Sequence, residues 1–150
     1  MTSVESLPGG TESLMLYVEI QQFYGRHMRA MDECRVADWT SDFTEDAVSL
    51  TNARPEPHVG RAEIEAGAAA AADKLVADGV LRRHCLSTLH VEEASDGTVV
   101  ARSYAQLVRT PKGGVSELEL FCTCEDTFVR VGGRLLIRRR QVHREDLPKG

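Results

Sequence analysis

One acidic residue, Asp32, is predicted at the edge of an otherwise apolar helix face. From Leu14 to about Cys34, apolar side chains recur every three or four residues, which predicts a helix with one buried side. The predicted buried side carries Tyr17, Ile20, Tyr24, Met28 and Met31. A carboxylate at such an edge can take up a proton or orient a group that does. We therefore expect the stretch 23–47 to close a pocket with Asp32 in its wall.

Aromatic residues near Asp32 provide further candidates. Tyr24 lies two helical turns earlier on a nearby face, where its hydroxyl could polarise a substrate carbonyl or simply reach the rim of the core. Asp38 can cap a short second helix whose Trp39 and Phe43 face the core. Trp39, the only tryptophan, could instead form the wall of a site for a flat apolar ligand.

The rest of the chain predicts how these residues are positioned. A strand is expected near Ala47–Thr51, and an Ala-rich third helix over about Arg61–Ala77 that Gly79 can end. Long strands bounded by turn sequences follow at Leu81–Glu93, Thr98–Thr110, Val115–Arg130 and Arg134–Arg144. Helices followed by an antiparallel meander give an α+β fold. A long sheet must curl, so we expect a cone with three helices on its concave face and a cavity inside.

Strand alternation assigns side chains to faces of the last two strands. Leu118, Leu120, Cys122, Cys124 and Asp126 share one face of the first. In the basic run of the second strand, Arg139 shares a face with Leu135 and Ile137, opposite to Arg138 and Arg140. We place Arg139 at the pocket, where an arginine could hold an anionic group. Pairing with glutamates of the neighbouring strand is the alternative.

Composition excludes several classes of function. The net charge of −5 argues against nucleic acid and anionic membranes as partners, and no apolar run is long enough to span a bilayer. Cysteine and histidine spacings suggest no metal site, and no phosphate-binding loop is present, so we expect no cofactor. We expect reduced cysteines, a cytoplasmic location, a flexible tail over residues 1–12 and a single domain over residues 13–147.

With this order of elements, the chain resembles SnoaL-like proteins of the nuclear transport factor two-like superfamily. The matching residues are Met31-Asp32, Trp39, Phe43, Asp46-Ala47, Gly60 with Ile64, Arg83-His84, and Gly133 to Ile137 with Leu135 in place of a tryptophan. The resemblance spans about Leu14 to Asp146. The superfamily includes polyketide cyclases, relatives of scytalone dehydratase and the small β-subunits of aromatic-ring-hydroxylating dioxygenases, so the resemblance implies the fold more strongly than any activity.

The resemblance implies a site built on Asp32 and His84. In scytalone-dehydratase-like members, an Asp at the end of the first helix and a His at the start of this strand face the cavity. A carboxylate beside an imidazole fixes its tautomer and stabilises its charged form, which suits general acid–base catalysis. The second histidine of those dehydratases has no counterpart at Arg109 to Lys112. A hydrogen bond that merely satisfies two buried polar groups is the alternative.

The expected function follows from this resemblance. We expect an enzyme that needs no cofactor and that cyclises, dehydrates or isomerises a small, polyketide-like molecule, with His84, Asp32 and Tyr24 as catalytic candidates. The expected pocket-lining residues are Met28, Trp39, Phe43, Leu86, Leu120, Cys122, Cys124 and Arg139. The resemblance also implies a homodimer formed through the opposite sheet face. The alternative function is a non-catalytic binding or assembly subunit like a dioxygenase β-subunit.

Overall fold

The computed structural model describes residues 9–149. In chain order its elements are helices α1 (Gly10–Asp32) and α2 (Val36–Thr40), strands β1 (Phe43–Thr51) and β2 (His58–Val59), helix α3 (Arg61–Asp78), and strands β3 (Val80–Glu93), β4 (Val99–Pro111), β5 (Glu117–Val131) and β6 (Arg134–Arg144). Gly79 adopts the left-handed conformation, with φ of 64°, and ends α3 as the sequence predicts.

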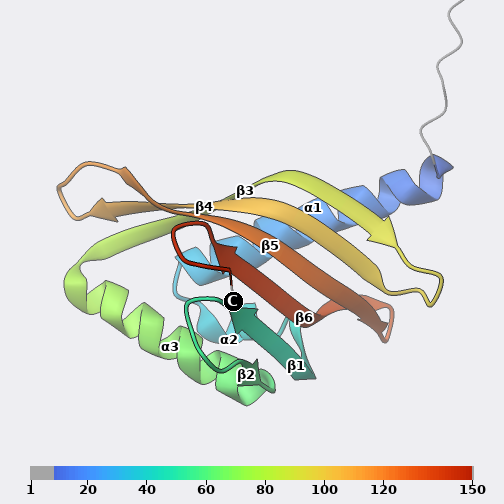
Figure 1. Cartoon of the computed structure of the whole chain (residues 1–150), viewed down its shortest axis with the longest axis horizontal. Helices are drawn as coiled ribbons and strands as arrows, with labels where there is room; N and C mark the ends of the chain where they lie inside the picture. The colour runs from blue at the N-terminus through green and yellow to red at the C-terminus, as the bar shows by residue number, and fades with distance from the viewer. Residues whose placement is uncertain (1–8, 150) are drawn as a thin grey trace, which may run out of the picture.

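All six strands join one curled, unclosed sheet that the three helices cover on its concave side (Figure 1). The strand order is β2-β1-β6-β5-β4-β3, and β3 to β6 form the predicted antiparallel meander. The α+β cone is therefore confirmed. Two features were not predicted: β1 runs parallel to β6, and the two-residue strand β2 extends the sheet beyond β1.

Irregularities in pairing bend the sheet and change which side chains face inward. On β3, two residues lie between Ser87 and His90, whereas only one lies between their partners on β4, and Thr88 has a φ of 53°. On β6, Arg138 has no partner between the pairs Phe128↔Ile137 and Thr127↔Arg139. An extra residue bends a strand and shifts its side-chain alternation by one position.

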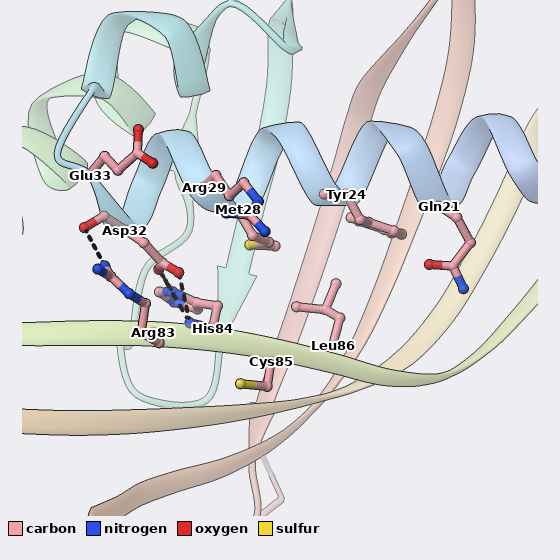
Figure 2. A pocket seen from close by; sticks show the side chains of 11 residues that line it. Gln21, Tyr24, Met28, Arg29, Asp32, Glu33, Arg83, His84, Cys85 and Leu86 are labelled. Atoms are coloured by element: carbon pink, nitrogen blue, oxygen red, sulfur yellow. Dashed lines mark hydrogen bonds and ion pairs between the residues drawn. The ribbon is translucent and has the colours of Figure 1, made fainter. Parts of the chain in front are cut away.

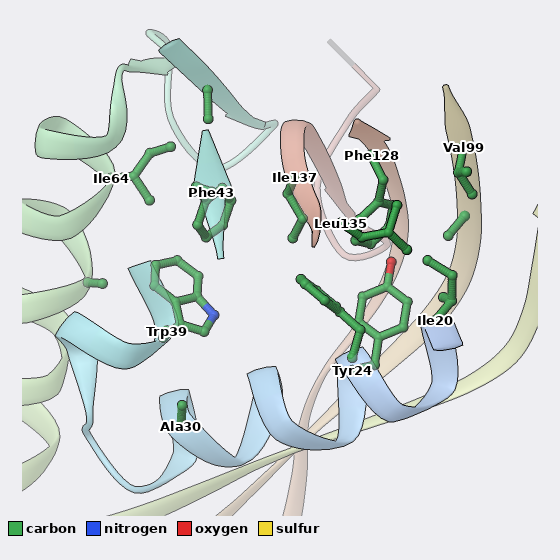
Figure 3. Packing of buried hydrophobic residues seen from close by; sticks show 14 residues of the cluster. Ile20, Tyr24, Ala30, Trp39, Phe43, Ile64, Val99, Phe128, Leu135 and Ile137 are labelled. Carbon is green, nitrogen blue, oxygen red and sulfur yellow. The ribbon is translucent and has the colours of Figure 1, made fainter. Parts of the chain in front are cut away.

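The core forms where the helices meet the concave sheet face (Figure 3). Phe43, Phe128 and Ile137 are completely buried, and Ile20 of α1 packs in the same cluster. Two small residues of α3, Ala68 and Ala72, are also buried. Small side chains let this helix approach its neighbours closely.

The first helix differs from its predicted form in extent and rotation. It begins at Gly10, inside the segment expected to be a tail; residues 1–8 of that segment lie outside the described residues. Its buried residues are Ile20, Phe23, Tyr24, His27 and Ala30. His27 therefore lies at the centre of the buried face, whereas Tyr17, predicted to be buried, is 37% exposed.

Two smaller predictions were also wrong. Asp38 lies inside α2 and does not cap it, because Arg35 occupies the N-cap position. Leu118, predicted to share a face with the pocket residues Leu120 and Cys122, is 60% exposed. Glu119 has no partner between the pairs Leu107↔Leu120 and Val108↔Leu118, and this irregularity turns Leu118 outward.

Candidate active site

The end of helix α1 is built to fix Asp32. The backbone N–H of Arg35 donates to the carbonyl of Ala30 at 2.8 Å, and that of Cys34 donates to the carbonyl of Met31 at 3.0 Å. This pair of bonds is a Schellman motif, in which the residue after the helix adopts a left-handed conformation. Cys34 has that conformation, with φ of 58°. Asp32 therefore occupies the last helical position in a terminus held by its own backbone.

His84 meets Asp32 across the gap between α1 and β3 (Figure 2). Nδ1 of His84 lies 2.7 Å from Oδ1 of Asp32, and the backbone N–H of His84 donates to both carboxylate oxygens at 3.1 and 3.2 Å. Arg83 donates from Nη1 to the Asp32 carbonyl at 3.2 Å. The side chains of Asp32 and His84 are 8% and 20% exposed, so a ligand can reach the pair.

This geometry selects one state of the imidazole. When Asp32 is ionised, its carboxylate accepts the Nδ1–H of His84, which leaves Nε2 unprotonated and able to accept a proton. No hydrogen bond to Nε2 is formed within the part of the chain that the structure describes. A proton taken up there would create an imidazolium stabilised by Asp32. The pair can thus serve as a general base and then as a general acid.

His84 of this pair also lines a cavity of about 240 Å³. Its lining residues come from α1, α2 and five strands: Met28, Met31, Trp39, Ser49, Thr51, His84, Leu86, Ala105, Leu107, Leu120, Cys122, Cys124, Asp126, Arg140, Val142 and Arg144. Most of these side chains are apolar or small. The expected cavity is therefore present, and Trp39 forms part of its wall without filling it.

A groove of about 460 Å³ lies between α1 and β3 (Figure 2). Met28, His84 and Leu86 line both this groove and the internal cavity. Asp32, Arg29 and Arg83 give the groove a polar side. His84 therefore stands at the boundary between a groove with one polar side and a mostly apolar chamber.

A buried polar cluster lies in the cavity wall. Asp126 accepts Arg140 Nε at Oδ1 and Arg140 Nη2 at Oδ2, both at 2.8 Å, and the Tyr24 hydroxyl donates to Oδ2 at 2.8 Å. The Arg140 guanidinium also lies over the rings of Phe43 and Trp39, at 5.2 and 5.9 Å from their centroids. The cluster fixes a cation in the chamber with its charge already balanced.

Burial and charge set the protonation states in this wall. Burial, followed by the nearby Asp126 carboxylate, raises the pKa of Tyr24 well above its ordinary value. Burial alone lowers the pKa of Arg140, but its ion pair with Asp126 outweighs this and raises it. Burial raises the pKa of the Cys124 thiol to about 12. At neutral pH the phenol and the thiol are therefore uncharged, and Cys124 is a weak nucleophile.

The structure brings most of the predicted site residues together. His84 and Asp32 are in contact, and the predicted pocket residues that line the chamber are Met28, Trp39, Leu86, Leu120, Cys122 and Cys124. Phe43 is instead a fully buried core residue behind the wall. Tyr24 lies along the groove with its hydroxyl committed to Asp126.

The placement of Arg139 was wrong. The irregularity at Arg138 shifts the alternation of β6, so that Arg140 lines the cavity and Arg139 bonds to Gln141 outside it. Sequence reasoning also assigned no role to Asp126. Its position on the cysteine face of β5 was the one available indication that it could enter the cavity.

Another histidine–carboxylate pair lies outside the cavity. His27 is completely buried, with Nδ1 2.8 Å from Oδ2 of Asp42 and its ring stacked between Phe23 and Trp39. Arg26 and Arg134 donate to the other oxygen of Asp42. Burial, only partly opposed by Asp42, lowers the pKa of His27 to about 4. This pair supports Trp39 from behind and is not accessible to a ligand.

Within residues 9–149, no three or more His, Cys, Asp or Glu side chains are grouped so as to bind a metal ion. Over the same residues, no helix is both long and apolar enough to cross a membrane.

Comparison with known proteins identifies the family. Residues 12–141 match the SnoaL-like domain family, and the chain belongs to this family. No curated protein matches the chain. The solved structures it resembles include Aln2 from a Streptomyces species, which is 39% identical with a TM-score of 0.82, over 88% of this chain and 92% of that one.

Other solved structures share the fold to a similar degree. ActVI-ORFA from Streptomyces coelicolor is 29% identical with a TM-score of 0.83, over 91% of this chain and 99% of that one. A protein from Catenulispora acidiphila, solved in complex with S-DNPA, is 31% identical with a TM-score of 0.78, over 89% and 96% of the two chains. The β-subunit of a putative aromatic-ring-hydroxylating dioxygenase from Novosphingobium aromaticivorans is 16% identical with a TM-score of 0.72, over 92% and 94%, which shows the shared fold.

Proposed function

We propose that this protein is an acid–base enzyme that cyclises, dehydrates or isomerises a small, mostly apolar ketone of the polyketide type. The observation that carries the proposal is the contact between Asp32 and His84 at the boundary of an apolar cavity. His84 is the proton-transferring group, and Asp32 orients it and stabilises its charged form. No step of this chemistry requires an electron acceptor or donor.

The cavity favours an enzyme over a purely structural subunit. An assembly module of this fold has no need of an empty chamber, and its interior could be filled by Met28, Trp39 and Phe43. Here a chamber of about 240 Å³ persists beside these residues, and its wall includes His84, which is paired with Asp32. The Catenulispora acidiphila relative in complex with S-DNPA further supports ligand binding by proteins of this family.

We also propose that the outer sheet face pairs two copies of the chain. Tyr104 and Phe121 lie together on it, with ring centroids 5.6 Å apart, and Tyr104 is 41% exposed. Such an aromatic pair can form the centre of an interface. Sedimentation at several protein concentrations measures this: a dimer that dissociates in a Tyr104→Lys variant supports it, and a monomer throughout refutes it.

Proton transfer can be tested without knowing the substrate. Tetralone exchanges the hydrogens next to its carbonyl for deuterium in D₂O, and proton NMR follows that exchange. We expect the protein to accelerate exchange and His84→Gln to reduce the acceleration by about 10²- to 10⁴-fold. His90→Gln is the matched control, because His90 is 63% exposed and its nearest charged partner is Glu92 rather than Asp32. If the His84→Gln variant accelerated exchange as much as the wild type, His84 would not be the proton-transferring group.

A further inference from the structure

Arg140 presents one unoccupied side of its guanidinium in the cavity wall. Nε and Nη2 form a fork to the two oxygens of Asp126, whereas Nη1 has no hydrogen-bond partner among the described residues. Nη1 does not belong to the fully buried polar atoms that lack a partner. It therefore keeps some accessible surface, and Arg140 lines the cavity. The chamber thus contains a fixed cationic donor with one face available.

The charge around this donor determines what it can hold. Asp126 balances Arg140, while Tyr24 and Cys124 remain uncharged at neutral pH because burial raises the pKa of each. A carboxylate or phosphate is bound best by the two-pronged fork of an arginine. In Arg140 this fork is already bound to Asp126, and an incoming anion would be repelled by the nearby Asp126 carboxylate. A single neutral oxygen needs only one donor and is not repelled by that carboxylate.

We propose that Arg140 binds the carbonyl oxygen of a neutral ketone and stabilises the enolate formed from it. The proposal rests on the proposed function and names its substrate class. Nε2 of His84 takes a proton from the carbon next to the carbonyl. The C–H electron pair becomes a C=C bond, and the carbonyl π pair moves onto the oxygen held by Nη1 of Arg140. Returning the proton to another carbon isomerises the ketone, and giving it to a departing hydroxyl releases water.

The partial neutralisation by Asp126 matters for this role. A donor that binds the developing negative charge more strongly than the neutral carbonyl lowers the barrier more than one that binds substrate and transition state equally. A rigid guanidinium, held by Asp126 and stacked on Phe43 and Trp39, needs no rearrangement as the charge appears. The cavity volume of about 240 Å³ lies just below the usual range of ligand sites, which selects a compact skeleton.

Paired probes test this preference directly. Acetylnaphthalene and naphthoate share a ring system and differ in presenting a neutral carbonyl or a carboxylate. Trp39, the only tryptophan, lines the cavity and reports binding by its fluorescence, with calorimetry as a second measurement. We expect the wild type to bind the ketone about 10- to 100-fold more tightly than the carboxylate, the range of one hydrogen bond to a charged donor.

Two neighbouring arginines provide a matched pair of variants. Arg140→Met removes the donor and should weaken acetylnaphthalene binding about tenfold or more. Arg139→Met changes the adjacent residue outside the cavity and should leave both affinities unchanged. Wild-type ketone affinity in a folded Arg140→Met variant would overturn the proposal, as would a wild type that prefers naphthoate.

Since Arg140→Met leaves Asp126 buried without its cation, an Asp126→Asn variant forms an independent arm. The asparagine can still bond to Tyr24 and Arg140, but the charge of Arg140 is then unbalanced. We expect this variant to bind naphthoate more tightly than the wild type does, so that the preference for acetylnaphthalene over naphthoate narrows or reverses. An unchanged preference for acetylnaphthalene overturns the proposal. Ligand binding is measured separately from tetralone exchange. A negative exchange result for His84 therefore does not affect the binding test of Arg140, and a negative binding result does not affect the exchange test of His84.

Discussion

Nδ1 of His84 lies 2.7 Å from Oδ1 of Asp32, and the same carboxylate accepts the backbone N–H of His84. One acid at the end of α1 therefore fixes both the imidazole ring and the strand that carries it. Two residues separated by 52 positions in the chain share one rigid unit. The unit leaves Nε2 as the atom through which the ring can exchange protons.

Replacing Asp32 by Asn should damage catalysis more than binding. The amide has no charge to stabilise an imidazolium and can donate to Nδ1, which favours the wrong tautomer. We expect the turnover number for tetralone exchange to fall about 10²- to 10⁴-fold with a small change in KM. An Asp32→Glu variant, which keeps the charge, should recover part of the loss. If KM alone rises, Asp32 has only a binding role.

Cys34→Gly should stabilise the protein. Cys34 has φ of 58°, a conformation that costs non-glycine residues about 1 kcal/mol or more. Glycine is the usual residue at this position of a Schellman motif. We expect the free energy of unfolding to rise by about 1 kcal/mol in urea titrations. Cys34→Ala keeps the strained conformation and serves as the control; an equal gain in that variant would assign the effect to the thiol.

Tyr24→Phe should destabilise the wall of the cavity. The change removes the hydroxyl that donates to Oδ2 of Asp126, whose side chain is 1% exposed, while the Arg140 ion pair remains. We expect a loss of about 1–2 kcal/mol in the free energy of unfolding. Tyr104→Phe alters a hydroxyl on the outer face and should cost much less. Similar losses in both variants would contradict a special role for the buried bond.

His27 should make the folded state sensitive to acid. Its pKa is lowered to about 4 in the folded state, against 6.5 as the ordinary value. The stabilisation is complete above pH 6.5 and is lost as the pH falls toward 4, because the unfolded chain binds a proton that the folded state cannot. The free energy of unfolding should fall by about 3 kcal/mol from this residue across that range.

The matched variants for this effect are His27→Gln and His90→Gln. Denaturant titrations at about pH 7, 6, 5 and 4 give the slope of stability with pH. We expect His27→Gln to flatten the slope and His90→Gln, at an exposed position, to leave it unchanged. A wild-type slope in the His27→Gln variant would show that other groups cause the acid sensitivity.

The sequence by itself determined the order of the elements and, through a family resemblance, the Asp32–His84 part of the site. Turn residues such as Gly79 and the helical and strand periodicities of apolar residues are local properties of the chain. The helices and the meander could therefore be predicted. The Asp32–His84 pair came from a resemblance to a family whose fold places those positions together, and the structure confirms their contact.

Only the tertiary structure decided which side chains enter the cavity. Arg140 replaced Arg139 because a single unpaired residue, Arg138, reversed the alternation of β6, and no local pattern marks such a residue. The buried cluster likewise joins Tyr24 of α1 to Asp126 and Arg140 of the β5–β6 hairpin, about a hundred residues further along the chain. Its members have no local spacing that would identify them, because they meet only when the curled sheet closes over α1.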